Sequence, residues 1–236
     1  MKKIFFILFI ASFQISIAQA SADFFNKANT FFSNHIVNGK VNYKNIKANP
    51  KALNALMETV ANTKVNTTND KNYKAFYINA YNLAVIKGIV DNYPTKSPLN
   101  IGGFFDRKKH NIAGENITLN DLENKKLRAV YPKEARFHFV LVCAGLGCPP
   151  IINSAYTPNK LESQLKKQTQ TAMDNPKFIR VKENNVKISQ IFEWYKKDFT
   201  QYGSLVEFIN LYRTKKLPTN IKTGFYDYDW SLNDIK

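Results

Sequence analysis

The stretch from 70 to 91, DKNYKAFYINAYNLAVIKGIVD, is the strongest helix signal in the sequence. Aromatic and aliphatic side chains recur at helical spacing from Tyr73 to Ile89, and Tyr93-Pro94 ends the pattern. The apolar face is broad, so we expect this helix to be central and buried. Asn79 and Asn82 lie three positions apart on it, which makes their amides neighbours on one face.

The segments around this helix predict an α+β fold. Helical periodicity predicts further helices over 22–37, 50–60, 120–128, 158–173, 190–199 and 204–212. Asn49, Asn120 and Ser189 are expected to cap three of them. β-Forming runs predict hairpins at 108–119 and 178–188, an inner strand over Arg136–Cys143 and a terminal strand over Phe225–Trp230. We therefore expect a helix-rich domain with a small antiparallel sheet, compatible with a papain-like arrangement.

The first twenty residues have the layout of a secretory signal. MKKIFFILFIASFQISIAQA begins with two lysines, continues through an apolar run and ends in Ala18-Gln19-Ala20. The unbroken apolar run is about eight residues, whereas a membrane span needs ~20. We expect cleavage after Ala20, export to the periplasm or the medium, no transmembrane segment after cleavage, and a single globular domain over 21–236.

The charge of the chain restricts its partners. The formal net charge is +16, and basic proteins attract anions. Lysines are scattered in short pairs along the sequence, so no basic stripe indicates a nucleic-acid partner. A solubilising surface is the simplest interpretation, and attraction to an anionic envelope component is the alternative.

Thiol chemistry is indicated by the segment RFHFVLVCAGLGCPP, which holds the only histidine near a cysteine. An imidazolium beside a thiol lowers its pKa from about 8.5 and activates it as a nucleophile. Cys143 and Cys148 are therefore candidate nucleophiles, His138 is a candidate base, and Asn79 or Asn82 could orient the imidazole. In a regular strand His138 and Cys143 point to opposite faces, so this hypothesis needs a bulge or the use of Cys148.

The two cysteines have competing explanations. An exported chain with two cysteines five positions apart favours a structural disulfide, which would remove the nucleophile. Metal ligation is disfavoured because the chain has only three histidines and zinc needs four ligands. We expect no metal and no cofactor, structural roles for His35 and His110, and, as an alternative for the two asparagines, hydrogen bonds to backbone groups.

Three acidic residues have local explanations. Asp121 and Glu123 stand at a predicted helix start, where the helix dipole favours acids, and they point in different directions. Asp198 lies near the end of a predicted aromatic helix, where a negative charge is unfavourable unless it is paired. A salt bridge or a role in a site is therefore expected for Asp198.

Four segments, in order along the chain, resemble the bacterial domain of unknown function 547 family. They are 75–82 (AFYINAYN), 119–128 with its LNDLE and Leu127-Arg128, Arg136–Pro150, and Ser189–Phe199. The resemblance implies an exported or envelope-located domain without an assigned reaction. It singles out Asn79, Tyr81, Asn82, Glu123, Arg128, His138, Cys143, Cys148, Pro149 and Asp198, which makes Tyr81, Glu123, Arg128 and Asp198 candidate binding residues. The family usually carries histidine where this chain has Asn124, and tryptophan where Tyr77 stands.

Two functions are compatible with these patterns. The first is a Cys/His hydrolase or acyltransferase that acts on an envelope peptide, amide or thioester. The second is a non-enzymatic envelope module in which a Cys143-Cys148 disulfide stabilises a pocket for a small-molecule or peptide ligand.

Overall fold

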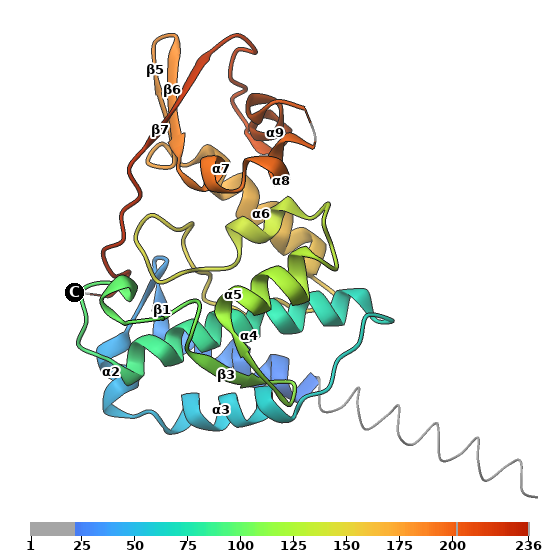
Figure 1. The fold of residues 1–236 in the computed structure, drawn as a ribbon, viewed down its shortest axis with the longest axis vertical. Coiled ribbons are helices and arrows are strands. Elements are labelled where there is room, and N and C mark those ends of the chain that lie inside the picture. The colour runs from blue at the N-terminus through green and yellow to red at the C-terminus, as the bar shows by residue number, and fades with distance from the viewer. Residues whose placement is uncertain (1–21, 202, 236) are drawn as a thin grey trace, which may run out of the picture.

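The chain is described by a computed structural model that covers residues 22–201 and 203–235. The expected signal segment and its cleavage site lie outside these residues. Helices with two short hairpins make up one end of the molecule, and a small three-stranded sheet with short helices makes up the other (Figure 1). Among the described residues, no helix combines the length and apolar character needed to span a membrane.

The first lobe is built around the buried helix α4 (Asp70–Asp91). Its N-cap is Asn69, whose side chain accepts a hydrogen bond from the Asn72 amide, and 16 of its 22 residues are buried. The elements around α4 are a helix over 22–35, β1 (Ile36–Val37), β2 (Lys40–Val41), α2 (Tyr43–Ala48), α3 (Lys51–Asn62), η1 (Pro98–Asn100), β3 (Lys109–Ile112) and β4 (Glu115–Thr118). The predicted central helix is confirmed, and so is the first hairpin.

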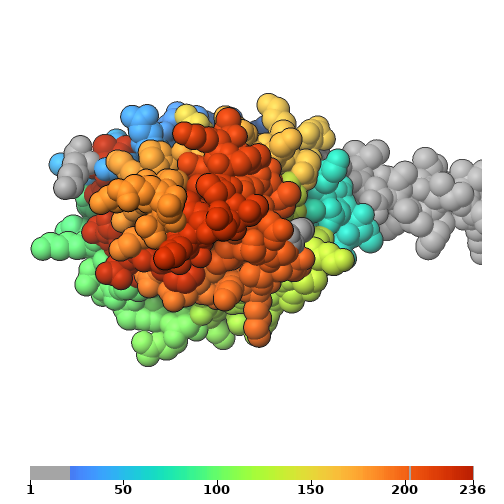
Figure 2. Space-filling model, turned by 90° about the horizontal axis from the view of Figure 1, so that it is seen from above, coloured from blue at the N-terminus to red at the C-terminus, as the bar shows by residue number. Residues whose placement is uncertain are grey.

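The second lobe has its own hydrophobic cluster, rich in phenylalanine. It contains α6 (Leu161–Asp174), β5 (Ile179–Lys182), β6 (Asn185–Ser189), α7 (Ile191–Trp194), α8 (Lys196–Thr200), α9 (Leu205–Tyr212) and β7 (Lys222–Tyr226). β5 pairs antiparallel with β6 and β7 pairs parallel with β6. The expected sheet was wholly antiparallel, and the parallel pair corrects that detail. Seen from this end, residues of the last quarter of the chain form most of the surface (Figure 2).

The inner strand predicted over Arg136–Cys143 is wrong. Residues Ala135–Phe139 form a 3₁₀ helix, η3, and the chain then runs irregularly to the cysteines. Every side chain from Phe137 to Val142 is buried. The run is therefore apolar because it is buried on all sides, and it lacks the alternation of buried and exposed residues that a half-buried strand shows. The buried amide of Asn82 hydrogen-bonds the backbone at Val140 and Val142 in place of a neighbouring strand.

Several predicted boundaries shift for local reasons. The first helix ends at 35, because Asn38-Gly39 forms the turn between β1 and β2. Asn49 ends α2, and Pro50 precedes α3. The helix expected over 190–199 is broken at Tyr195 into α7 and α8, and Ser189 closes β6 while its hydroxyl accepts from the Ile191 amide.

A C-terminal strap, residues 227–235, connects the two lobes. After β7 the chain crosses back to the first lobe, where Leu232 bonds to the backbone of Lys96 and Asn233 to that of Val41 and Ala144. The buried Tyr43 hydroxyl donates to Asn233 Oδ1 at 2.8 Å. The predicted terminal strand is partly correct, since β7 ends at Tyr226 and the residues that follow form this strap.

Candidate functional site

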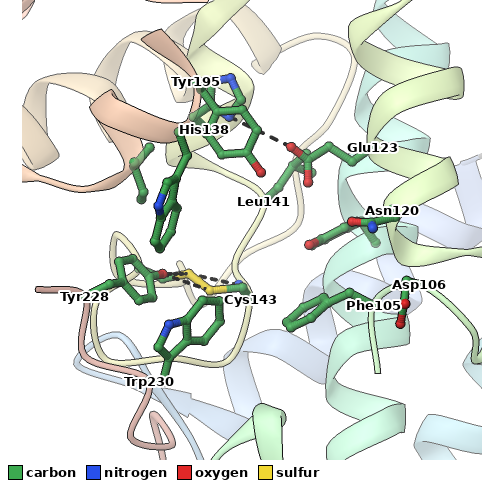
Figure 3. A pocket seen from close by; sticks show the side chains of 14 residues that line it. Phe105, Asp106, Asn120, Glu123, His138, Leu141, Cys143, Tyr195, Tyr228 and Trp230 are labelled. Atoms are coloured by element: carbon green, nitrogen blue, oxygen red, sulfur yellow. Dashed lines mark hydrogen bonds and ion pairs between the residues drawn. A yellow bond between two sulfur atoms is a disulfide. The ribbon is translucent and has the colours of Figure 1, made fainter. Parts of the chain in front are cut away.

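A cavity of about 440 Å³ lies between the two lobes (Figure 3). Both lobes and the segment that joins them line it. The lining residues are Tyr81, Phe105, Asp106, Asn120, Glu123, His138, Leu141, Cys143, Cys148, Ile191, Trp194, Tyr195, Tyr228 and Trp230.

His138 is held by a charged pair behind the cavity. Its Nε2 atom lies 2.8 Å from Asp198 Oδ2, and the same oxygen accepts from Arg128 Nε at 2.9 Å and Nη2 at 2.8 Å. Partial burial by itself raises the pKa of Asp198, but the hydrogen bond and charge of His138 and the charge of Arg128 hold it below its ordinary value. The expected pairing of Asp198 is confirmed, and its carboxylate fixes the imidazole.

Tyr195 and Glu123 complete the surroundings of the imidazole. The Tyr195 ring stacks on His138 with 4.0 Å between ring centroids. Glu123 Oε1 lies 3.9 Å from His138 Nδ1, and the Glu123 side chain is only about one-tenth exposed. Burial raises the pKa of the Tyr195 hydroxyl, and the charge of Glu123 raises it further. Glu123 therefore lies buried at the cavity wall.

Glu123 reaches this position through an unusual turn. It lies in η2 (Leu122–Arg128), a π-helical segment that follows the short helix α5 (Leu119–Asp121). Such wide turns frequently occur at functional sites. Thr118 caps α5 by accepting from the Asp121 amide, so the cap predicted at Asn120 is wrong, and Asn120 lines the cavity rim instead. Glu123 lies at the cavity wall, whereas Asp121 pairs with Lys125 at the surface.

Cys143 and Cys148 form a disulfide with Cα atoms 6.4 Å apart. The Tyr228 hydroxyl lies 2.9 Å from each sulfur. Because neither sulfur carries a hydrogen in a disulfide, the tyrosine is the donor to both. Burial raises the pKa of Tyr228, which keeps the hydroxyl protonated. In this structure neither cysteine is a thiol.

The glycines of the AGLGCPP loop allow the strap to approach closely. A Cβ on Gly147 would lie 2.8 Å from the Tyr228 ring, and one on Gly145 would lie 3.2 Å from the Asp229 carbonyl oxygen. The left-handed residue in this loop is Ala144, with φ of 65°. The two glycines therefore serve packing against the strap more than the turn itself.

Asn79 and Asn82 hold backbone outside the cavity. The Asn79 amide donates to the carbonyls of Ala75 and Tyr156 and accepts from the Tyr156 amide. Asn82 donates to Val140 and accepts from Val142, both at 2.9 Å. Neither lines the cavity, and Asp198 is the residue that orients His138. The alternative expectation, that these amides satisfy backbone groups, describes both of them.

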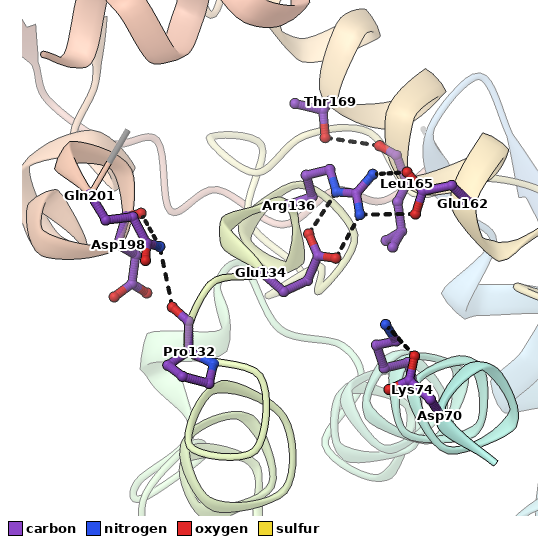
Figure 4. Close-up of polar contacts among 10 residues, drawn as sticks. All are labelled: Asp70, Lys74, Pro132, Glu134, Arg136, Glu162, Leu165, Thr169, Asp198 and Gln201. Carbon is purple, nitrogen blue, oxygen red and sulfur yellow. Dashed lines mark hydrogen bonds and ion pairs between the residues drawn. The ribbon is translucent and has the colours of Figure 1, made fainter. Parts of the chain in front are cut away.

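One arginine, Arg136, and two carboxylates hold the start of η3 in place. Arg136 bonds Glu134 through Nε and Nη2, and Nη1 and Nη2 of the same guanidinium reach Glu162 on α6 (Figure 4). The hydrogen bonds that Arg136 donates to Glu134 raise the pKa of Arg136, and burial opposes this effect. Two carboxylates thus fix the position of η3, on which His138 lies.

The sequence predictions located part of this site. Tyr81, Glu123, His138 and both cysteines line the cavity, while Arg128 and Asp198 lie directly behind His138. The aromatic wall that the second lobe and the strap contribute was not predicted; it consists of Trp194, Tyr195, Tyr228 and Trp230. The clusters FEWY and FYDYDW were a signal for it, because such dense aromatic runs require burial or a ligand.

The arrangement can bind an organic molecule and can hold or move a proton at His138. Aromatic faces, one buried carboxylate and an imidazole fixed by Asp198 converge on the cavity. Within 22–201 and 203–235, no group of three or more His, Cys, Asp or Glu side chains is placed to hold a metal ion.

A protein-family model matches part of the chain. Residues 65–171 match the family described as "Protein of unknown function, DUF547". The match includes three of the four motifs, and the fourth, Ser189–Phe199, lies outside it. No curated protein and no solved structure matches the chain.

Proposed function

Since residues 65–171 belong to the DUF547 family, we propose that the chain is an exported, non-enzymatic binding module whose inter-lobe cavity takes a small-molecule or peptide ligand. One observation carries this proposal. The cavity combines six aromatic side chains with a buried carboxylate, whereas both cysteine sulfurs in its wall are joined as a disulfide. Ligand pockets are concave, mostly apolar and supplied with a few placed polar groups.

The fixed geometry of the walls supports binding. The disulfide and the Tyr228 hydroxyl hold the loop before Pro149, and the strap holds Tyr228 and Trp230 against it. Walls that are ordered before a ligand arrives lower the entropic cost of association. The signal-like sequence over 1–20 supports export, and an oxidising compartment is where such a disulfide persists.

Intrinsic fluorescence gives a direct test. The chain has two tryptophans, Trp194 and Trp230, and both line the cavity, so any emission change on titration reports this site. Acetylated, amidated tripeptides with leucine, lysine or glutamate at the centre would be titrated and then analysed by mass spectrometry. We expect saturable quenching by at least one peptide, with no cleavage. Turnover of any of them would reject the proposal, and so would absence of quenching by these peptides and by small organic probes alike.

A second function is favoured by the position of the cysteines. Cys143, Cys148 and the His138 imidazole all line one cavity, and Asp198 orients the imidazole as an acid–base partner requires. After two-electron reduction by a dithiol, one thiolate could attack an acyl carbon, release the amine or thiol, and pass the acyl group to water or another acceptor. This is the Cys/His hydrolase or acyltransferase alternative.

Thiol counting separates the two functions. The binding module has no free thiol in the natively purified mature protein and no iodoacetamide labelling. The enzyme has, after reduction by a dithiol, at least one reactive thiol whose alkylation rate falls in His138→Ala, whereas in the reduced binding module this rate does not depend on His138. His138→Gln serves as a second variant, because it retains a polar side chain beside Asp198 if the alanine variant fails to fold.

A further inference from the structure

The charge of the cavity is opposite to that of the chain. The chain carries a formal +16, yet the described residues that line the cavity include the carboxylates of Glu123 and Asp106 and neither lysine nor arginine. A concave site lined by one sign of charge concentrates ligands of the opposite sign. The surface as a whole attracts anions, whereas this cavity favours cations.

Glu123 has little compensation from protein charges. Arg128 lies on the same helical segment, but its Nε and Nη2 bond Asp198 and its Nη1 bonds Asn124. Among the described residues, the only ion-pair contact of Glu123 is His138 Nδ1 at 3.9 Å, which exceeds hydrogen-bond length. A buried carboxylate is costly unless a cation or donors reach it.

The opposite wall offers ring faces. Tyr228 and Trp230 have centroids 4.7 Å apart, and Trp230 stacks with Trp194 at 6.0 Å. Figure 3 shows Glu123 and Asn120 on one side of the cavity and Tyr228 and Trp230 across from them. A cation over such rings is stabilised by roughly 0.5 to 2 kcal/mol. Trp194 is 46% exposed, so the ring wall continues to the surface as an entrance.

From these observations we propose that the ligand carries an organic ammonium group, held between the Glu123 carboxylate and the rings of Tyr228 and Trp230. The inference rests on the proposed binding function and specifies its ligand class. Asp106 at the exposed rim adds a second negative charge along the entrance.

Matched pairs of probes test the inference. Choline is compared with 3,3-dimethylbutan-1-ol, its neutral isostere. Nα-acetyl-lysine amide, which keeps its side-chain ammonium group, is compared with Nα-acetyl-norleucine amide. Each pair is measured by tryptophan fluorescence and calorimetry. We expect at least one ammonium probe to bind about tenfold or more tightly than its neutral partner, a difference of about 1.4 kcal/mol. Equal binding of the neutral partners in both pairs would overturn the inference.

Variants assign the effect to the carboxylate. Glu123→Gln should reduce the affinity for the ammonium probe to that for its neutral partner. Glu183→Gln, at an exposed hairpin turn, should leave the affinity unchanged. If Glu123→Gln fails to fold, Asp106→Asn at the exposed rim should still weaken the ammonium probe about twofold. The proposal is contradicted if the ratio of the affinities for the ammonium probe and its neutral partner is unchanged in a folded Glu123→Gln variant. If that variant does not fold, the same outcome in Asp106→Asn contradicts it.

The failures of the two proposals are distinguishable. If neutral or acidic tripeptides quench the fluorescence while no ammonium probe is preferred, the binding function stands and the ligand class is wrong. If none of the peptides or ammonium probes binds, both proposals fail together.

Discussion

His138 Nε2 lies 2.8 Å from Asp198 Oδ2, although the two residues are 60 positions apart in the chain. The contact joins η3, in the segment between the lobes, to α8 in the second lobe, and Arg128 on η2 extends it into the first lobe. One carboxylate therefore links three parts of the fold at the back of the cavity. Its removal is expected to loosen the site and the lobe contact together.

Asp198→Asn removes the charge that pairs with His138 and Arg128. Hydrogen bonds to charged groups contribute about 1.5 to 3 kcal/mol each, and the Asp198 side chain is 22% exposed, which weakens them through solvent screening. We expect a loss of about 2 kcal/mol in the free energy of unfolding, measured in urea. Asp227→Asn at an exposed position should change it little, and a similar loss in both variants would contradict the assignment.

Acid should remove the contribution of Asp198. Its pKa in the folded protein lies below the ordinary value of 3.8, so the unfolded chain takes up the proton first. The stabilisation is complete above the unfolded pKa and is lost as the pH falls through the folded pKa. The stability difference between the natural protein and Asp198→Asn should shrink on acidification from pH 7 to below 3. A difference that stays constant or grows would exclude this mechanism.

Asn82→Ala and Asn79→Ala form a matched pair on α4. Each leaves buried backbone groups without their side-chain partner, Val140 and Val142 for Asn82, and Tyr156 for Asn79. Each unsatisfied group costs about 1 to 3 kcal/mol, so we expect both variants to lose about 3 kcal/mol. Chemical denaturation measures these losses.

The two asparagine variants should differ at the cavity. Asn82 holds the segment between His138 and the disulfide, whereas the backbone that Asn79 holds at Tyr156 does not line the cavity. The tryptophan emission of the folded Asn82→Ala variant should therefore differ from that of the natural protein, whereas the emission of the folded Asn79→Ala variant should equal it. An equal change in both, or none in Asn82→Ala, would show that Asn82 does not support the site.

Local signals explain which elements were predictable. The bounds of α4 follow from an apolar face and a stop at Pro94, and α9 has the capping box of Ser204 and Glu207. The strand predicted over 136–143 is wrong because the neighbours of this segment are distant in sequence. Its residues are buried on all sides and show no strand period, and the amide of Asn82 takes the place of a pairing strand. Nothing local reports such a long-range partner.

The site was predictable to the extent that its residues are close in the chain. His138, Cys143 and Cys148 occur within one short segment, so their association could be inferred. The aromatic wall joins α7 to the strap, and the break at Tyr195 that brings its ring onto His138 has no sequence signature. Both features depend on how the lobes pack.

Gly147→Ala tests whether the strap must approach the disulfide loop. A Cβ at Gly147 would meet three atoms of the Tyr228 ring at 2.8 to 2.9 Å, so the ring must shift and its hydroxyl must leave the sulfurs. Overpacking of this kind costs about 1 to 3 kcal/mol, and we expect such a loss in urea unfolding. Because Tyr228 contacts both Trp194 and Trp230, the emission of the folded variant should change as well.

Gly224→Ala is the matched control, since a Cβ at this position would meet nothing within 4 Å. This variant should be neutral or more stable by up to about 1 kcal/mol. Equal stability of the two variants, with unchanged emission in Gly147→Ala, would mean that the loop tolerates the side chain and that Tyr228 is not fixed by the close approach.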